Sequence, residues 1–430
     1  MEVHMRSLEV EGGAGIQGEI SVSGNKNAAL PMIAACLLTS EPMILHNVPD
    51  ILDVRTMLDI ARSLGAEADF QDHTLRICCP AIKTATISRE LCSRNRTSIL
   101  FAAPLLVRAG RAVLSPPGGD VIGRRRLDGH FYGLEKLGGS MKFDGCYRFS
   151  SKGRLAGCEM FLDEASVTAT EQILIAAATA SGHTTLYNAA GEPHVCDLAN
   201  MLNAMGAKIS GHGSNVIEID GVDSLHGVEY TVQGDHIEAG SFLALAAVCG
   251  GGLVLHGTGP CRNYWMIRRT FEKLGILMDL QPDRIEIRPG QEMVIRNDFG
   301  GHLPTIADGP WPQFPSDMMS CTIVAATQAA GSVLFFEKMF ESRIYFVDRL
   351  ISMGAQAVVC DPHRVLITGK ANLHAVEMSS PDIRAGMAMV IAALAARGTS
   401  RIHQADVIYR GYENLVDKLT AIGAKVREIN

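Results

Sequence analysis

One unit recurs along this chain, and it constrains the fold more than any other feature of the sequence. In its first copy, Val54, Met57, Ala61 and Leu64 are apolar and follow helical spacing, and Gly65 comes directly after them. Glycine in this position is typical of a helix that ends in a left-handed cap. The corresponding glycines are Gly65, Gly138, Gly206, Gly275, Gly354 and Gly423, which are 73, 68, 69, 79 and 69 residues apart. The near-constant spacing predicts six copies of one structural unit.

Each copy combines strands with a helix. Residues 42–45 read as a strand, residues 47–53 as a turn, and a second strand is expected near residues 74–78. The same order recurs around residues 184–219 and 331–367. Repeats of about 20–50 residues usually form solenoids, whereas longer units can group into globular domains. We therefore expect an α/β protein of two similar domains with three repeats each, one spanning 26–233 and the other 1–25 plus 234–430.

Composition narrows the class of protein. The chain has 430 residues, of which 47% are hydrophobic, but no run approaches the roughly 20 apolar residues of a membrane span. Its start lacks the basic and apolar regions of a signal peptide. The 11 cysteines are scattered, with no CxxC or Cys/His ligand spacing. We expect a cytoplasmic protein with reduced thiols, no metal site and no membrane partner.

The net charge of −7 argues against a generic nucleic-acid binder, which usually has a basic face. An anionic small substrate would therefore need a local cationic site. Residues 13–18 match the GxGxxG pattern of dinucleotide-binding proteins, but a strand-like stretch rather than a helix follows them. No cofactor is therefore expected.

Three polar features are candidates for chemistry. Lys26 and Asn27 lie where a strand gives way to an apolar helical segment, and a helix N-terminus attracts anions. Arg125 lies in a run of three arginines after Gly118-Gly119, and arginine binds carboxylate and phosphate through two parallel hydrogen bonds. Asp317 lies in a turn and could act as a general base. Each also has an ordinary structural interpretation: a solvated lysine, a solvated basic loop and a turn-capping aspartate.

With these repeats, the chain resembles the enolpyruvyl transferase family over almost its whole length. The motifs that carry the resemblance are residues 23–31 (SGNKNAALP), 47–50 (NVPD), 118–123 (GGDVIG), 314–318 (FPSDM), 340–343 (FESR) and 410–413 (RGYE). The resemblance implies an inverted α/β barrel fold, with two domains of three repeats and a cleft between them. It further implies transfer of the enolpyruvyl group of phosphoenolpyruvate to the 3'-hydroxyl of UDP-N-acetylglucosamine, a step of peptidoglycan synthesis.

The resemblance also assigns roles to individual residues. It implies catalytic roles for Asp120, which would protonate the methylene carbon, for the base Asp317, and for Lys26 and Arg410. The residues that it implies for substrate binding are Asn27, Arg96, Arg125, Asp128, His130, Ser166, Val167, Glu192, Arg343 and Arg384. Phosphoenolpyruvate and a uridine nucleotide would be the small-molecule partners, and the oligomeric state stays open.

The chain departs from the family pattern at several positions. Asp120 stands where the family usually has the cysteine that the epoxide fosfomycin alkylates, so resistance to this inhibitor is expected. Glu164, His194 and His236 replace residues that are usually a lysine, an acid and an arginine. These changes leave open a simpler acceptor such as UMP. A non-catalytic paralogue that binds a nucleotide sugar is the alternative from another class.

Overall fold

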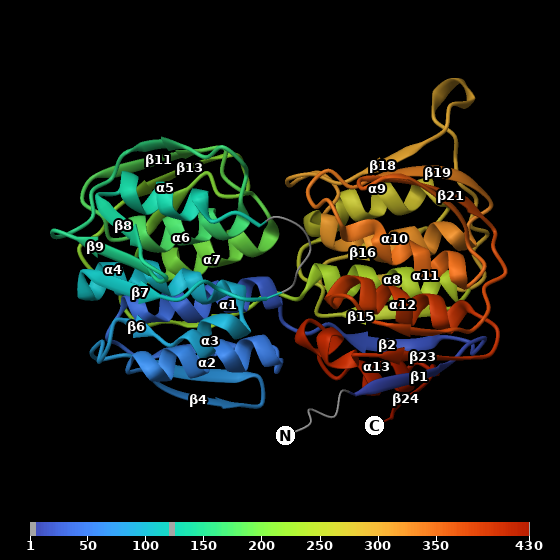
Figure 1. Cartoon of the computed structure of the whole chain (residues 1–430), viewed down its shortest axis with the longest axis horizontal. Helices are drawn as coiled ribbons and strands as arrows, with labels where there is room; N and C mark the ends of the chain where they lie inside the picture. Colours follow the sequence, from blue (N-terminus) through green and yellow to red (C-terminus); the bar gives the residue numbers. More distant parts are fainter. Residues whose placement is uncertain (1–5, 120–124, 430) are drawn as a thin grey trace. The chain divides into compact units, whose positions relative to one another are not determined.

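The computed structural model describes residues 6–119 and 125–429, which divide into two compact units (Figure 1). The N-terminal unit comprises residues 24–119 and 125–233, and the C-terminal unit comprises residues 6–23 and 234–429. Each has its own hydrophobic core. The mixed α/β prediction is confirmed. Among the described residues, no helix is both long and apolar enough to cross a membrane.

The described residues form six four-stranded sheets of one topology. One edge strand of each sheet runs parallel to its neighbour, and the other two pairings are antiparallel. Those of the N-terminal unit are β14(Glu229–Thr231)-β3(Met43–His46)-β5(Thr74–Cys78)-β4(Glu67–Gln71), β6(Thr86–Ile87)-β7(Arg111–Leu114)-β9(Tyr147–Ser151)-β8(Gly139–Phe143) and β10(Glu159–Phe161)-β11(His183–Tyr187)-β13(Val216–Asp220)-β12(Lys208–Ser210). Those of the C-terminal unit are β2(Gln17–Ser21)-β15(Gly252–His256)-β17(Arg284–Ile287)-β16(Met278–Gln281), β18(Thr305–Ala307)-β19(Gly331–Phe336)-β21(Arg364–Gly369)-β20(Gln356–Asp361) and β22(Glu377–Ser379)-β23(Thr399–His403)-β1(Ser7–Glu11)-β24(Lys425–Ile429).

An inner helix follows the outer strand in each repeat, and these helices pack against one another within each unit (Figure 1). They are α1(Lys26–Ala35), α4(Ala102–Ala109), α6(Val167–Ala177), α8(His236–Val248), α10(Ser316–Gln328) and α12(Ile383–Ala395). Their sequences are apolar almost all round because sheets and neighbouring helices cover them. Leu243, Ile323 and Val390 are fully buried. Truncating such a residue as Leu243 to Ala is expected to cost about 2–5 kcal/mol of stability.

The outer helices are those whose ends the recurring glycines mark. They are α2(Leu52–Leu64), α5(Asp128–Lys136), α7(Pro193–Ala204), α9(Trp265–Lys273), α11(Val347–Ser352) and α13(Leu415–Ala421); the short α3(Arg89–Arg94) is additional. The glycine after each outer helix has a positive φ, from 78° at Gly275 to 116° at Gly65. Only glycine adopts this conformation without strain, which explains the periodicity of the sequence.

The chain passes from one unit to the other directly after two of these strands, β2 and β14. Strand β2 pairs with β15 of the C-terminal unit, although the chain then continues into α1 of the N-terminal unit. Strand β14 pairs with β3 of the N-terminal unit, although the chain then continues into α8. Glycines sit after both strands: a Cβ at Gly24 would lie 1.6 Å from the Asn47 carbonyl oxygen, and one at Gly234 would lie 1.9 Å from that of Gly257. Backbone therefore packs on backbone at both crossings.

Candidate active site

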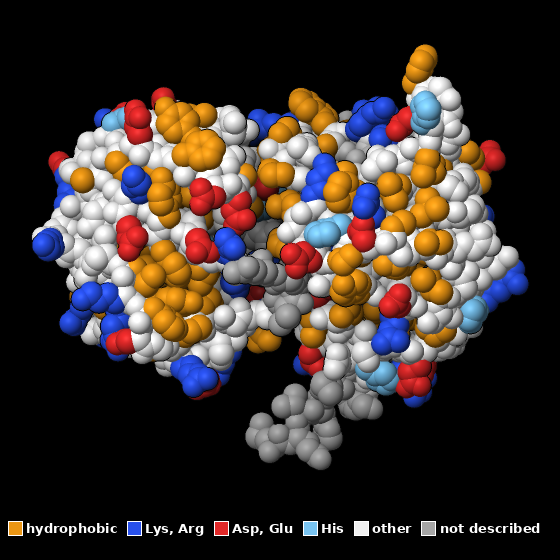
Figure 2. Space-filling view, turned by 45° about the horizontal axis from the view of Figure 1, so that its top comes forward, with side chains coloured by type: hydrophobic (Ala, Val, Ile, Leu, Met, Phe, Trp, Pro, Cys, Tyr) orange, Lys and Arg blue, Asp and Glu red, His pale blue; other side chains and the backbone are white. Residues whose placement is uncertain are grey.

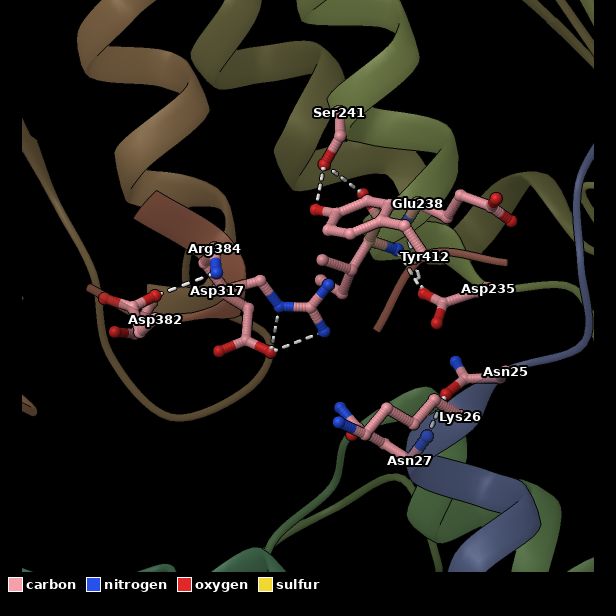
Figure 3. A network of polar contacts seen from close by, with 12 residues as sticks. Asn25, Lys26, Asn27, Asp235, Glu238, Ser241, Asp317, Asp382, Arg384 and Tyr412 are labelled. Carbon is pink, nitrogen blue, oxygen red and sulfur yellow. Dashed lines mark hydrogen bonds and ion pairs between the residues drawn. The ribbon is translucent and has the colours of Figure 1, made fainter. Parts of the chain in front are cut away.

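The start of α1 holds a buried cation. Asn25 caps the helix by accepting hydrogen bonds from the backbone N–H groups of Asn27 and Ala28, at 2.9 and 3.3 Å (Figure 3). The Lys26 ammonium lies 2.7 Å from a carboxylate oxygen of Asp53 on α2, and both residues are buried. Asn27 is half-buried. The ion pair fixes a positive charge at a helix N-terminus, which itself favours anions.

A second cation of the N-terminal unit holds the chain around Arg125. Arg96 donates hydrogen bonds to the backbone carbonyls of Arg125 and Arg126, at 2.8 and 2.9 Å. Burial, together with the nearby charge of Arg125, lowers the pKa of Arg96 to about 10, so its guanidinium is still charged at neutral pH. Arg125 is half-buried. Two of the predicted phosphate-binding arginines therefore lie together. Asp120, for which we expect the proton-donor role, lies outside the described residues.

Three residues that the resemblance implies for substrate binding, His130, Ser166 and Val167, lie at or near the start of α6. His130 of α5 is buried, and its ring nitrogens contact the side chains of Gln172 and Thr168. Burial lowers the pKa of His130 to about 4, so the ring is neutral at physiological pH. Ser166 caps α6, and Val167 is its first residue. The sequence did not signal that His130 would be bound to α6 through both nitrogens.

The remaining predicted residues of this unit lie at two helix starts. Asp128 is exposed in the first turn of α5. Glu192 precedes Pro193, the first residue of α7. The neighbouring Glu171 of α6 is fully enclosed, and its pKa is raised well above the usual range by burial and by the charge of Glu192. Glu171 is a buried acid that the sequence analysis did not single out.

Asp317 is the centre of a charged cluster in the C-terminal unit. Its carboxylate accepts a hydrogen bond from Arg343 at 2.7 Å through one oxygen, and bonds from Arg384 at 3.0 and 3.1 Å through the other. Both arginines are buried, whereas the Asp317 side chain keeps 29% of its surface exposed. Burial alone would raise the pKa of Asp317, but the two guanidinium groups hold it well below its usual range. At rest, Asp317 is an anion bound by two cations.

Aromatic rings and a helix cap support these arginines. The Arg384 guanidinium lies 5.5 Å from the ring centroid of Tyr412, whose hydroxyl lies 2.9 Å from that of Ser241 (Figure 3). Asp382 caps α12 by accepting hydrogen bonds from the backbone N–H groups of Arg384 and Ala385. Sequence reasoning missed Tyr412, although it lies within the RGYE motif. Such contacts orient a cation that would otherwise be free to rotate.

His236 and Arg410 are two further residues of this unit that the sequence singled out. His236, the first residue of α8, is buried with its ring edge toward Trp311, at 6.3 Å between centroids. Burial lowers the pKa of His236 to about 4, although the charge of Asp317 opposes this shift. Arg410 is half-buried at the end of the 3₁₀ helix Ala405–Arg410. The structure therefore groups Asp317, Arg343, Arg384 and His236.

Acidic and basic side chains are interspersed on the face shown in Figure 2. Residues 6–119 and 125–429 contain no group of three or more His, Cys, Asp or Glu side chains placed to hold a metal ion.

Comparison with solved structures defines the class of fold. The structure superposes on the enolpyruvyl transferase NikO from Streptomyces tendae with a TM-score of 0.87 and 24% identity, covering 99% of both chains. It also matches EPSP synthase from Acinetobacter baumannii with a TM-score of 0.77 and 17% identity, covering 99% of this chain and all of that one. This is the fold of enolpyruvyl transferases, as predicted.

Sequence comparison defines the family. The profile of the family described as EPSP synthase (3-phosphoshikimate 1-carboxyvinyltransferase) matches residues 10–419, and the chain belongs to this family. Two curated relatives are called UDP-N-acetylglucosamine 1-carboxyvinyltransferase. The one from Treponema pallidum is 50% identical over 98% of this chain and 99% of its own length. The one from Bradyrhizobium diazoefficiens is 51% identical over 98% and 97%.

Proposed function

We propose that this protein transfers the enolpyruvyl group of phosphoenolpyruvate to the 3'-hydroxyl of UDP-N-acetylglucosamine and releases phosphate. The observation that carries the proposal is 50% identity, over almost the full length of both chains, to relatives named for carboxyvinyl transfer to that acceptor. The clustered cations of both units support it, because phosphoenolpyruvate carries a phosphate and a carboxylate. This activity would place the protein in the cytoplasm, at an early step of peptidoglycan synthesis.

The chemistry assigned to the residues is addition followed by elimination. Asp120 donates a proton to the methylene carbon of phosphoenolpyruvate, which leaves cationic character on the adjacent carbon. The acceptor hydroxyl attacks that carbon and gives its proton to Asp317. From the tetrahedral adduct, one methyl proton returns to the Asp120 carboxylate, and phosphate leaves with the proton held by Asp317, which restores the double bond and both acids. Lys26, Arg125 and Arg410 stabilise the developing phosphate charge.

The low pKa of Asp317 sets a condition on this mechanism. A carboxylate bound by two guanidinium groups accepts a proton poorly. The carboxylate and phosphate of phosphoenolpyruvate would compete with Asp317 for Arg343 and Arg384. As these arginines turn toward the substrate, Asp317 loses their stabilisation and becomes more basic. The substrate would therefore activate the base that the next step requires.

UMP is the second candidate acceptor, and Glu164, His194 and His236 are the residues that favour it. Glu164 is exposed, whereas His194 and His236 are buried. The names of the curated relatives do not favour UMP. A non-catalytic role is also not favoured, because the relatives are named as transferases.

Phosphate release tests the proposed function. Purified protein is incubated with phosphoenolpyruvate alone, with UDP-N-acetylglucosamine and with UMP, and inorganic phosphate is measured over time. We expect release only with UDP-N-acetylglucosamine. Release with UMP alone would support the alternative acceptor, and no release with either would refute transfer. The Asp144→Asn variant, which changes an exposed carboxylate on the loop after β8, is the control for preparation quality.

A further inference from the structure

Two buried carboxyl groups lie beside the Asp317 cluster without a role in the reaction described above. Asp308 follows β18 and Glu337 follows β19, and these strands are parallel neighbours in which Ala307 is paired with Phe336. The residue after each strand is therefore a carboxylic acid, and the Asp308 side chain reaches the backbone N–H of Lys338, the residue after Glu337. Both residues are 0% exposed.

The hydrogen bonds around this pair leave one oxygen of each group without a donor. Glu337 Oε1 accepts bonds from the Ser316 hydroxyl at 2.8 Å and the Phe340 N–H at 3.2 Å. Asp308 Oδ1 accepts a bond from the Lys338 N–H. Glu337 Oε2 and Asp308 Oδ2 are buried, and no N–H or O–H donor of the described chain reaches them. Two adjacent buried anions would repel each other, whereas one proton between these oxygens satisfies both.

A short chain of contacts connects the pair to the candidate base. Ser316 donates to Glu337 and accepts a hydrogen bond from Arg343. Arg343 then donates to Asp317 at 2.7 Å. We propose that Glu337 and Asp308 share one proton and that the uncharged Glu337, acting through Ser316, positions Arg343 for its ion pair with Asp317. Glu337 is thus a positioning residue, and its catalytic consequence rests on the proposed function.

The charges around Glu337 agree with this assignment. Burial and the neighbouring Asp308 raise the pKa of Glu337 to about 9, although the charge of Arg343 opposes the shift. The His363 ring contacts the backbone carbonyl of Glu337 through Nδ1 at 2.7 Å, and the His363 carbonyl accepts a bond from the Glu337 N–H at 2.8 Å. Arg343 is the cation that faces the pair, and the Lys338 ammonium lies over the ring of Phe336. Above pH 9, an ionised Glu337 would compete with Asp317 for Arg343.

Two variants test the proposal through the pH dependence of kcat/KM. In the wild type, kcat/KM should fall about tenfold between pH 8 and pH 10, because a group with a pKa near 9 loses its proton there. Glu337→Gln keeps an oxygen for Ser316 and an N–H donor for Asp308 but cannot ionise, so this alkaline fall should disappear. Asp308→Asn removes a charge that raises the pKa of Glu337, so the fall should move to lower pH. Glu218→Gln changes an exposed glutamate of β13 and should leave the profile as in the wild type.

A measurement without catalysis separates this proposal from the proposed function. The folded-state pKa of Glu337 lies above its unfolded value, so its contribution to stability is complete below the unfolded pKa and is lost as pH rises toward 9. Urea unfolding of Glu337→Gln should therefore show a weaker decline of stability from pH 5 to pH 9 than the wild type. Unchanged stability and activity profiles in both variants would overturn the proposal. A changed stability profile with an unchanged activity profile would overturn the positioning role and leave only the shared proton.

Discussion

The two units hold their cations in different ways. In the N-terminal unit, Arg96 is bound by backbone carbonyls, which carry no net charge, and Lys26 is paired with one buried carboxylate. In the C-terminal unit, Arg343 and Arg384 share the carboxylate of Asp317. The charge of Arg96 is therefore not offset by a bound carboxylate of the described residues, whereas Lys26, Arg343 and Arg384 must each exchange a carboxylate of the protein for a substrate anion. Under the proposed function, we expect Arg96 to serve initial binding and Asp317, with its two arginines, to serve the chemical step.

Replacing Asp317 should have the largest effect. Asp317→Asn removes the base, so kcat should fall roughly 100- to 10,000-fold. The substitution also leaves Arg343 and Arg384 buried beside a neutral amide, and breaking a buried ion pair costs about 3–5 kcal/mol of stability. Steady-state kinetics and urea unfolding measure the two effects. Asp223→Asn, which changes an exposed carboxylate paired with Arg154, should alter neither. A fall in kcat below about tenfold would exclude Asp317 as the base.

Asp120 tests the proton-donor role that the sequence predicts. Asp120→Asn should lose turnover about 100- to 10,000-fold, because an amide has no proton of suitable acidity. The wild type should resist fosfomycin, because a carboxylate is a far weaker nucleophile toward an epoxide than a thiolate. Asp120→Cys should gain time-dependent inactivation, since the neighbouring arginines of the sequence favour the thiolate. Progress curves with the epoxide test both the resistance of the wild type and the inactivation of Asp120→Cys. Rapid inactivation of the wild type would reveal another nucleophile.

Replacing Lys26 tests the binding role of the N-terminal unit. Lys26→Met should lower kcat/KM about 100- to 1,000-fold, the effect of removing one preorganised electrostatic contact. The loss should appear in kcat as well as in KM for phosphoenolpyruvate, because the lysine is proposed to bind the substrate and to stabilise the developing phosphate charge. The double variant Lys26→Met/Asp53→Asn should recover stability, because it removes the carboxylate that the lysine pairs with, but it should not recover activity. Recovery of activity in the double variant would mean that Lys26 only neutralises the buried charge of Asp53 and does not act on the substrate.

Tyr412 should show the smallest effect. Tyr412→Phe removes the hydroxyl contact with Ser241 and should cost about 0.5–1.5 kcal/mol of stability, while the ring beneath Arg384 stays in place. Tyr412→Leu also removes the ring and should lower kcat further than Tyr412→Phe. Comparing the two variants by kinetics and thermal unfolding separates the hydroxyl from the ring. Equal kcat values would show that the cation–ring contact does not orient Arg384.

The repeat structure was predictable because its signal is local. A glycine after each outer helix must take a positive φ, and Gly65 shows this in both sequence and structure. The position of Lys26 at a helix start was also predictable, since the polar residues Lys26 and Asn27 are followed by a run of apolar residues. The role of this lysine in substrate binding stays a prediction, as do the other assigned roles.

Contacts between distant segments were not predictable in this way. Arg343 and Arg384 are 41 residues apart in the sequence, and only the fold brings both to Asp317. The Glu337–Asp308 pair also depends on strand register, because Ala307 must lie opposite Phe336. Neither residue belongs to a motif that sequence reasoning singled out. Side-chain networks of this kind arise from three-dimensional packing and leave no periodic pattern.

Product analysis with labelled substrate tests the central claim most directly. Phosphoenolpyruvate labelled with ¹³C in its three carbons is incubated with the protein and UDP-N-acetylglucosamine, and the nucleotide product is isolated and examined by NMR. The account predicts that all three labelled carbons appear in the sugar nucleotide, attached through the 3'-oxygen as a vinyl ether. Label that remains in phosphoenolpyruvate or appears only as pyruvate, with an unchanged sugar nucleotide, would contradict it.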